Sequence, residues 1–386
     1  MAFNIPDGII NAVFLLWLLT MFFNFQIKTI LFSKRFTYLF FFLAWLFVVV
    51  TIGQGISAGI IRVYKLLMVL SPILMYDLYK NISRRECFFV IICFSILFVY
   101  NSSIIITFAN MTDGLGLRRI EDNYEVYNSI ASSISIALII PVISFFLFNP
   151  LPSSVKSNAF VKAFLKILLA LIIVYSIYVL FRAAFMTQLF VGILGIIWGA
   201  FYRKRNWKTR IVIYTIVPFV IFLSSYSLVM QKIDSIEDTF ILQEKMDEIY
   251  YTLSGQKSQA VDYEARSNRA LLSFNTFLKN PITGVVIESK GFEDQYKLGV
   301  GNHSEWADCF ALYGIPALLL LAFVFTSLKQ IGKDLKFYLF VAPYFIIGCL
   351  NPILFFPQTA TTFFFIPILL RYYYNNETRD SSRYIQ

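Results

Sequence analysis

The chain has 386 residues, of which 58% are apolar and 18% aromatic, and its mean hydropathy is +0.68. Only 15% of the residues are charged, whereas a soluble domain carries about 25%. This composition excludes a soluble enzyme, a nucleic-acid-binding protein and an intrinsically disordered chain. In a membrane protein the placement of the net charge of +10 along the chain matters more than its size.

Apolar runs predict an all-α, polytopic membrane bundle of about eleven transmembrane helices, within a range of ten to twelve because short runs meet near Gly53 and Pro352. A span needs about 20 apolar residues, and its backbone amides must bond within their own segment, which makes each span a helix. No basic residue precedes the first run, so we interpret it as a retained span rather than a signal peptide. The runs cover residues 8–27, 37–54, 57–78, 87–107, 128–148, 163–181, 183–201, 211–230, 306–328, 337–352 and 357–372.

Basic residues predict the orientation of these spans. Nineteen of the 33 Lys and Arg residues fall in alternate connections and in the C-terminal tail. The positive-inside rule makes those connections cytoplasmic, with the C-terminus inside and the N-terminus outside. The chain therefore divides into spans one to eight (1–230), one large external loop (231–305), and spans nine to eleven with a cytoplasmic tail (306–386). A long external loop among short connections is the expected place for function.

The external loop contains two amphipathic patterns. Apolar residues recur at near-helical spacing over 231–253. The sharper pattern covers 262–280, where the polar residues are spaced 4, 3, 4, 3 and 4 along one face of a helix, and Pro281 ends it. We expect this helix to lie along the outer membrane surface with its apolar side against the bundle. Its polar stripe comprises Asp262, Arg266, Arg269, Ser273, Thr276 and Asn280, and its apolar stripe comprises Ala270, Leu271, Phe274, Phe277 and Leu278.

Several basic side chains near the outer ends of the spans are candidates for anion binding. Arg182 lies in the predicted external hairpin between the sixth and seventh spans, and either binds an anion or extends to lipid headgroups. Arg62 and Lys65, one turn apart near the outer end of the third span, leave the same two interpretations open. Arg266 and Arg269 share the polar stripe, which is either functional or only a solvated helix face.

His303 is the single histidine of the chain and is flanked by Asn302, Ser304 and Glu305 at the end of the external loop. An imidazole titrates near neutral pH, so it can accept or donate a proton there. No metal is expected, because one histidine and four scattered cysteines without a CxxC pair do not make a ligand set. Phosphate-loop, GxSxG, HExxH and DxD motifs are absent from the sequence, which disfavours a metal-dependent nucleotide-sugar enzyme and predicts no cofactor.

The segment 302–316, Asn-His-Ser-Glu-Trp-Ala-Asp-Cys-Phe-Ala-Leu-Tyr-Gly-Ile-Pro, resembles the His-(Asn/Ser)-x-x-Leu-x-x-Leu-x-x-x-Gly motif of the O-antigen polymerase and ligase superfamily. Ala307 and Phe310 stand where leucines are usual. Upstream, Arg266 precedes Asn-Pro-Ile-Thr-Gly (280–284), which is similar to the family's arginine, amphipathic helix and Asn-Pro-Leu-x-Gly element. Phe-Arg-Ala-Ala-Phe (181–185) is similar to its Ser-Arg-x-Ala segment, with phenylalanine in place of serine.

This resemblance implies a GT-C-like fold and a polyprenyl-pyrophosphate-dependent, metal-independent glycosyltransferase in the bacterial cytoplasmic (inner) membrane, active at its periplasmic or extracellular face. Undecaprenyl-pyrophosphate-linked oligosaccharide would be both donor and acceptor, with the lipid bilayer, a flippase and a chain-length regulator of the same pathway as partners, and no nucleic acid. Arg182, Arg266 and His303 would be catalytic, the arginines meeting the departing pyrophosphate. The substrate-binding residues would be Arg269, Arg62, Lys65, Asn302 and Glu305.

Three functions remain open on the sequence. A polymerase of lipid-linked repeat units, for an O-antigen or a capsule, is the first. A ligase that passes the chain to a lipid A core uses the same donor. A flippase of the lipid-linked unit would be expected to carry ionisable residues near the membrane midplane, whereas a group-transfer enzyme would concentrate them at the outer surface.

Overall fold

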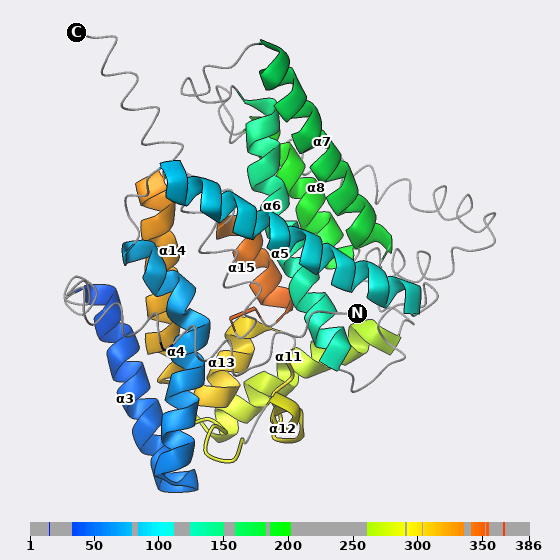
Figure 1. Ribbon diagram of the computed structural model, residues 1–386. Helices are drawn as coiled ribbons and strands as arrows, with labels where there is room; N and C mark the ends of the chain where they lie inside the picture. Colours follow the sequence, from blue (N-terminus) through cyan, green and yellow to red (C-terminus); the bar gives the residue numbers. More distant parts are fainter. Residues whose placement is uncertain are drawn as a thin grey trace. The chain divides into compact units, whose positions relative to one another are not determined.

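The computed structural model is helical, and the residues that it describes contain no β-strand, which confirms the all-α prediction for them. The described residues are 15, 33–78, 84–111, 124–149, 159–182, 186–201, 261–289, 292–302, 304–335, 341–351, 353–354 and 366. Figure 1 labels the helices: α3 (Lys34–Gln54), α4 (Ile56–Leu78), α5 (Arg84–Met111), α6 (Tyr124–Phe148), α7 (Ala159–Arg182), α8 (Met186–Phe201), α11 (Val261–Lys279), α12 (Phe292–Lys297), α13 (Glu305–Tyr313), α14 (Ala317–Leu335) and α15 (Val341–Leu350).

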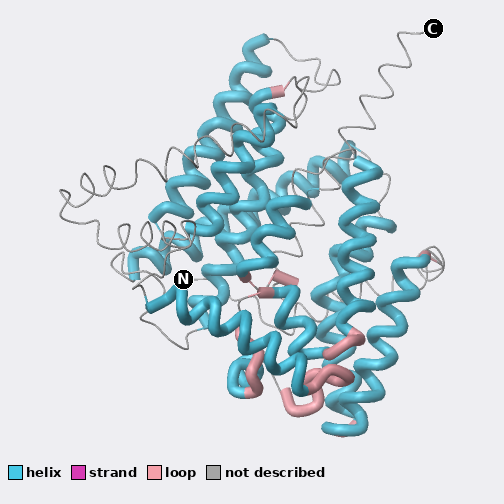
Figure 2. Tube along the Cα trace, turned by 180° about the vertical axis from the view of Figure 1, so that it is seen from behind, coloured by secondary structure: helices cyan, strands magenta, loops and turns pink. Residues whose placement is uncertain are grey.

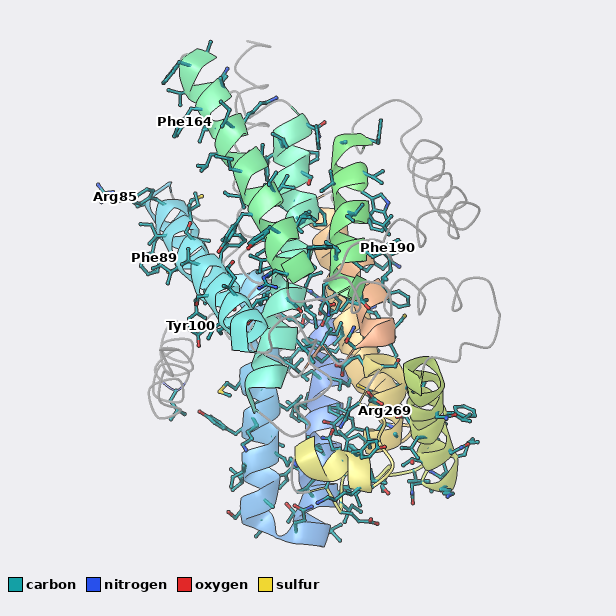
Figure 3. All side chains as sticks on the ribbon, turned by 90° about the vertical axis from the view of Figure 1, so that its right-hand side faces the viewer. Arg85, Phe89, Tyr100, Phe164, Phe190 and Arg269 are labelled. Carbon is teal, nitrogen blue, oxygen red and sulfur yellow. The ribbon has the colours of Figure 1, made fainter. Side chains whose placement is uncertain are left out.

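Four helices in the described part of the chain are long and apolar enough to cross a membrane: Lys34–Gln54, Cys87–Thr107, Ile130–Phe148 and Ala159–Arg182. Two shorter apolar helices are Thr187–Phe201 and Ala317–Gln330. Large apolar side chains such as Phe164 on α7 and Phe190 on α8 project outward and are exposed (Figure 3), as expected of surfaces that face lipid. Apart from the single positions 15 and 366, the predicted spans 8–27, 211–230 and 357–372 and the pattern at 231–253 lie outside the described residues, so the count of eleven stays a prediction.

The chain divides into two compact units. Unit 1 comprises Met1–Cys87, Ala270–Lys336 and Cys349–Arg371, and unit 2 comprises Phe88–Arg269, Phe337–Gly348 and Tyr372–Gln386. The boundary falls inside α11, so that the residues from Ala270 onward belong to unit 1 and those up to Arg269 to unit 2.

In unit 1, α3 packs along α4 on one side and contacts α14 (Figure 1). Ser33 caps the N-terminus of α3, because its hydroxyl accepts a hydrogen bond of 3.2 Å from the backbone N–H of Phe36. Gly55 ends α3 with a positive φ of 93°, and its N–H bonds to the carbonyl of Thr51. Figure 2 shows the loops at 280–289 and 298–302 in pink beside this α3–α4 turn.

The predicted span 306–328 is two helices, α13 and α14, which corrects the expectation of one continuous helix. Gly314 ends α13 with a φ of 65°. The N–H of Ile315 then bonds to the carbonyl of Pro281, 2.7 Å away, instead of continuing the helix. Pro316 supplies no N–H of its own, and it is favourable at the start of the next helix. The apolar run alone did not predict this break, although Gly-Ile-Pro marks its position.

In unit 2, α6 packs against both α7 and α8 (Figure 1), and it is the most buried of the span candidates. Three glycines of α8, at 192, 195 and 199, face α6 closely. A Cβ at Gly195 would lie 2.5 Å from Cγ of Pro141, and Asn149 donates to the carbonyl of Gly199. Small residues in one line let two membrane helices approach at backbone distance, which is how α6 and α8 are joined.

Helix α11 matches the predicted amphipathic helix, but the part of it in unit 1 presents the opposite face to the protein. The polar side chains Ser273 and Thr276 are buried, whereas the apolar side chains of Leu271, Phe274 and Leu278 are exposed. The expectation that the apolar side packs against the bundle is therefore wrong for these three side chains, whereas Phe277 of the same stripe does pack against Phe310 of α13, with 5.5 Å between the ring centroids. The polar side is turned inward because it forms hydrogen bonds with the loop at 298–304.

Candidate functional site

A buried hydroxyl on α11 binds the loop that leads into α13. The hydroxyl of Ser273 accepts a hydrogen bond of 2.7 Å from the backbone N–H of Gly301. The same hydroxyl donates to the carboxylate of Asp308, with 2.6 Å between Oγ and Oδ1. Ser273 has no exposed surface and Asp308 is 8% exposed, so both bonds are shielded from water. A buried bond of this kind costs far more to break than an exposed one.

The second oxygen of the Asp308 carboxylate holds the other end of the same loop. Oδ2 accepts a bond of 3.0 Å from the backbone N–H of Ser304, the residue at the N-cap of α13. An acidic side chain in the first turn also interacts favourably with the positive end of the helix dipole. Gly301 and Ser304, on either side of His303, are therefore tied to one carboxylate, the first through Ser273 and the second directly.

Two further features constrain this loop. The hydroxyl of Thr276, one turn after Ser273 on α11, donates to the carbonyl of Gly299 at 2.7 Å. Asn302 has a φ of 56°, in the left-handed region that residues other than glycine rarely occupy. Asparagine tolerates this region better than most residues do. A backbone held there directly before the single histidine is the kind of local strain that clusters at functional sites.

The two motifs that resemble the polymerase and ligase superfamily meet in unit 1 through their glycines. Gly284, with a φ of 58°, lies against the backbone of Leu312, and a Cβ there would be 2.4 Å from the Leu312 carbonyl carbon. Gly314 lies in turn against the backbone of Pro281, and a Cβ there would be 2.6 Å from the Pro281 oxygen. The N–H of Val285 also bonds to the carbonyl of Ala311. Segments 280–285 and 311–315 are thus packed backbone to backbone.

Glu305, the first residue of α13, is buried with only 1% of its surface exposed. Its Oε2 accepts hydrogen bonds from the backbone N–H groups of Ile353 (2.5 Å) and Leu354 (2.8 Å). The thiol of Cys309 lies 3.3 Å from Oε1. Burial raises the pKa of Glu305 to about 7; the two backbone bonds and Cys309 oppose the shift, and the nearby Asp308 adds to it. This carboxyl therefore exchanges a proton near neutral pH.

Arg62 on α4 binds the protein's own backbone. Its guanidinium donates to the carbonyl of Ser289 and lies 3.3 Å from the Ser289 hydroxyl. Gln54, at the end of α3, donates to the carbonyls of Ile287 and Ser289. The turn between α3 and α4 is thus attached to the end of segment 280–289. Lys65, predicted to act beside Arg62, is exposed one turn further along α4.

The predicted catalytic residues lie in different parts of the chain. Arg182 is the last residue of α7 in unit 2, and it is exposed. Arg269 is partly buried on α11, one turn before Ser273, and Arg266 belongs to the same helix. The side chain of Arg266 and the whole of His303 lie outside the described residues. The convergence of Arg182, Arg266 and His303 in one pocket therefore stays a prediction.

Sequence reasoning missed the roles of Ser273, Asp308 and Gln54. A usable signal existed for Ser273, because it lies in the polar stripe of α11, and for Asp308, because it follows Ser304 by one helical turn at a helix start. Gln54 and Arg62 bind carbonyls more than 200 residues away in the chain, for which a single sequence carries no signal. Among the described residues, no group of His, Cys, Asp and Glu is arranged to hold a metal ion.

The chain was also compared with known proteins. No protein-family model matches it, and no curated protein matches it significantly.

Proposed function

We propose that this protein is a polymerase of lipid-linked oligosaccharide repeat units, for an O-antigen or a capsular polysaccharide. It transfers a glycan from undecaprenyl pyrophosphate to a sugar hydroxyl at the outer face of the bacterial cytoplasmic membrane. The reaction breaks the bond between the anomeric carbon and the pyrophosphate oxygen and forms a bond from that carbon to the acceptor oxygen. The acceptor proton leaves with a base, and the pyrophosphate departs on the lipid.

The proposed roles follow from this chemistry. His303 orients the acceptor hydroxyl and takes its proton. Arg182 and Arg266, with Arg269 as a third cation, neutralise the charge that develops on the leaving pyrophosphate, since a guanidinium pairs with phosphate oxygens and stays charged. Asn302, directly before the histidine, belongs to the same binding region, and Glu305 contributes by fixing the start of α13, because its buried carboxylate binds the backbone of Ile353 and Leu354. In this proposal Arg62 contributes by fixing segment 280–289, in keeping with its bonds to Ser289.

The observation that carries the proposal is the meeting of the two resembling motifs. Segments 280–284 and 302–316 were each selected by their sequence pattern, and they pack against each other through Gly284 and Gly314. The polar stripe of α11, which starts upstream of the first motif, bonds to both sides of the position of His303 in the second. Two unrelated matches would have no reason to share one structural element.

The distribution of charge favours group transfer over transport of the lipid-linked unit. In the four described span candidates, Lys and Arg occur only within the first eight residues or at the last residue, and Asp and Glu do not occur. Transport of a charged headgroup through the bilayer would call for ionisable residues near the midplane. A ligase would use the same site and would differ from a polymerase only in the acceptor.

The test is deletion of the gene in its host, complementation with variants, and inspection of surface glycan on a gel. We expect wild-type protein to restore long chains, and His303→Ala and Arg266→Ala to leave only product carrying a single repeat unit. The control is Asn275→Ala, an exposed polar position on α11, which should restore the full ladder. An unchanged ladder with His303→Ala would refute the assignment. Complete loss of glycan from the core in the deletion strain would indicate the ligase instead.

A further inference from the structure

Helix α11 and the turn after it expose a continuous line of apolar side chains. Leu271, Phe274, Leu278 and Ile282, here called the apolar ridge, follow one another at spacings of 3, 4 and 4, and each is more than half exposed. The first three lie on one face of α11, and Ile282 follows them in the turn after the helix. Single exposed apolar side chains are common on protein surfaces, but a contiguous line of large ones marks a surface that contacts something apolar.

The opposite face of the same helix shows that the ridge is not an accident of composition. A helix on a water-soluble protein turns its apolar side to the core and its polar side to water. In α11 the two buried positions are polar, because Ser273 and Thr276 are hydrogen-bonded inside the protein, while the ridge faces outward and Phe277 packs inward, against Phe310. This inverted arrangement would be unfavourable in water. It is the stable arrangement when the surroundings of the ridge are hydrocarbon.

The ridge continues into an apolar helix of the protein. The carbonyl of Pro281 accepts a bond from the N–H of Ile315, which brings the end of the ridge next to the start of α14. Ile315 and Leu318 are also more than half exposed. They open the apolar stretch Ala317–Gln330. One apolar surface therefore passes from α11 through Ile282 to the outside of α14.

We infer that the apolar ridge is inserted among the acyl chains of the membrane leaflet, so that α11 lies in the plane of the membrane interface with bilayer phospholipid as its partner. The exposed Lys279, about 140° around the helix from Phe274, then projects away from the acyl chains toward water. The loop at 298–304 is bound to the face of α11 that points away from the lipid. This inference goes beyond the proposed function, because it holds whatever reaction the loop supports.

The test is site-specific photo-crosslinking of the full-length protein in its native membrane. The variant Phe274→p-benzoylphenylalanine, and separately Leu278→p-benzoylphenylalanine, would be irradiated, purified and analysed by mass spectrometry for covalent adducts. We expect phospholipid adducts at both positions. The matched control is Lys279→p-benzoylphenylalanine, because Lys279 is exposed on the same helix but lies about 140° around it from Phe274. Its phospholipid yield should be several-fold lower.

The positive control is Leu318→p-benzoylphenylalanine on α14, and only protein that elutes as a single monodisperse peak would be scored. Equal phospholipid yields at Phe274 and Lys279 would overturn the inference. So would adducts at Phe274 and Leu278 to another protein, to a second copy of the chain, or to a polyprenyl carrier in place of phospholipid. Absence of adducts at both ridge positions while Leu318 gives them would also overturn it.

Discussion

The hydroxyl of Ser273 and the carboxylate of Asp308 lie 2.6 Å apart in a buried hydrogen bond, although 35 residues separate them in the chain. The same hydroxyl accepts a hydrogen bond from the backbone N–H of Gly301, so it serves as both donor and acceptor. Through this pair, α11 and α13 are joined to the loop between them. The conformation of that loop therefore depends on Ser273, a fully buried side chain that cannot contact a substrate.

Replacing Ser273 with alanine should lower stability markedly. The variant leaves the N–H of Gly301 without the hydroxyl and removes one donor from the Asp308 carboxylate, and a loss of this kind costs about 1–3 kcal/mol. We expect a lower melting temperature for Ser273→Ala in detergent or nanodiscs, measured by a thermal shift assay. Asn275→Ala on the same helix is exposed and should change the melting temperature little. Equal melting temperatures for the two variants would contradict the buried network.

Replacing Gly284 with alanine should destabilise the protein far more than replacing Gly55 with alanine. Both have a positive φ, but a Cβ at Gly55 meets nothing within 4 Å, whereas one at Gly284 meets the Leu312 backbone. Gly55→Ala therefore carries only a backbone cost, about 1–3 kcal/mol, because φ 93° and ψ 164° lie in a region that is essentially restricted to glycine. Gly284→Ala adds a backbone clash, for a total of about 3 kcal/mol or more.

The measurement is the yield of folded protein and its melting temperature for both alanine variants. A Gly284→Ala protein as stable as Gly55→Ala would mean that segments 280–285 and 311–315 are not packed backbone to backbone. Gly314→Ala should behave like Gly284→Ala, since its Cβ would meet Pro281 from the other side of the same contact.

The sequence predicted the positions of most described helices because long apolar runs leave little choice in a membrane. The runs at 37–54, 57–78, 128–148 and 163–181 all fall within or close to α3, α4, α6 and α7. The amphipathic pattern also predicted α11 to within a residue at each end. Helical periodicity depends only on neighbours in the chain, so it can be read locally.

The face that α11 turns inward could not be predicted in the same way. Periodicity shows that a helix has two faces, but which face is buried depends on what lies opposite it. Here the partners of Ser273 are Gly301 and Asp308, whose bonding groups are polar. Similarly, nothing around Glu305 indicates that its carboxylate binds the backbone of Ile353 and Leu354. Local sequence patterns therefore did not predict hydrogen bonds between residues that are far apart in the chain.

Arg62 should matter for stability, and Lys65 should not. The guanidinium of Arg62 bonds to Ser289, and a hydrogen bond that involves a charged group contributes about 1.5–3 kcal/mol. We expect Arg62→Gln to lower the melting temperature of the purified protein in the absence of substrate. Lys65→Gln, on the exposed side one turn further along, is the matched control and should leave it unchanged. If Arg62 only bound substrate, both variants would melt like the wild type.

Glu305 should make the folded protein less stable as the pH rises. An ordinary salt-bridged carboxylate has the opposite effect. Its pKa is raised from 4.5 to about 7 in the folded protein. The folded state therefore binds the proton more tightly than the unfolded state does. The resulting stabilisation is fully present below pH 4.5 and is lost as the pH rises through about 7. Its full size is on the order of 3 kcal/mol.

The melting temperature should thus fall between pH 4.5 and 7.5 in the wild type, and Glu305→Gln should flatten this slope. Glutamine keeps an oxygen for the two N–H donors but does not titrate. Glu288→Gln removes an exposed carboxylate of the same unit and should leave the slope as in the wild type. A Glu305→Gln protein with an unchanged slope would show that another group governs this range.

The bonds from Glu305 to Ile353 and Leu354 also bear on how the protein is made. During synthesis, Glu305 leaves the ribosome nearly fifty residues before the two N–H groups that it binds. The start of α13 can therefore take its final form only after positions 353 and 354 have been translated and have left the ribosome. A premature stop codon shortly before position 353 would spare every residue of the loop at 298–304 and still leave a buried acid without its backbone donors.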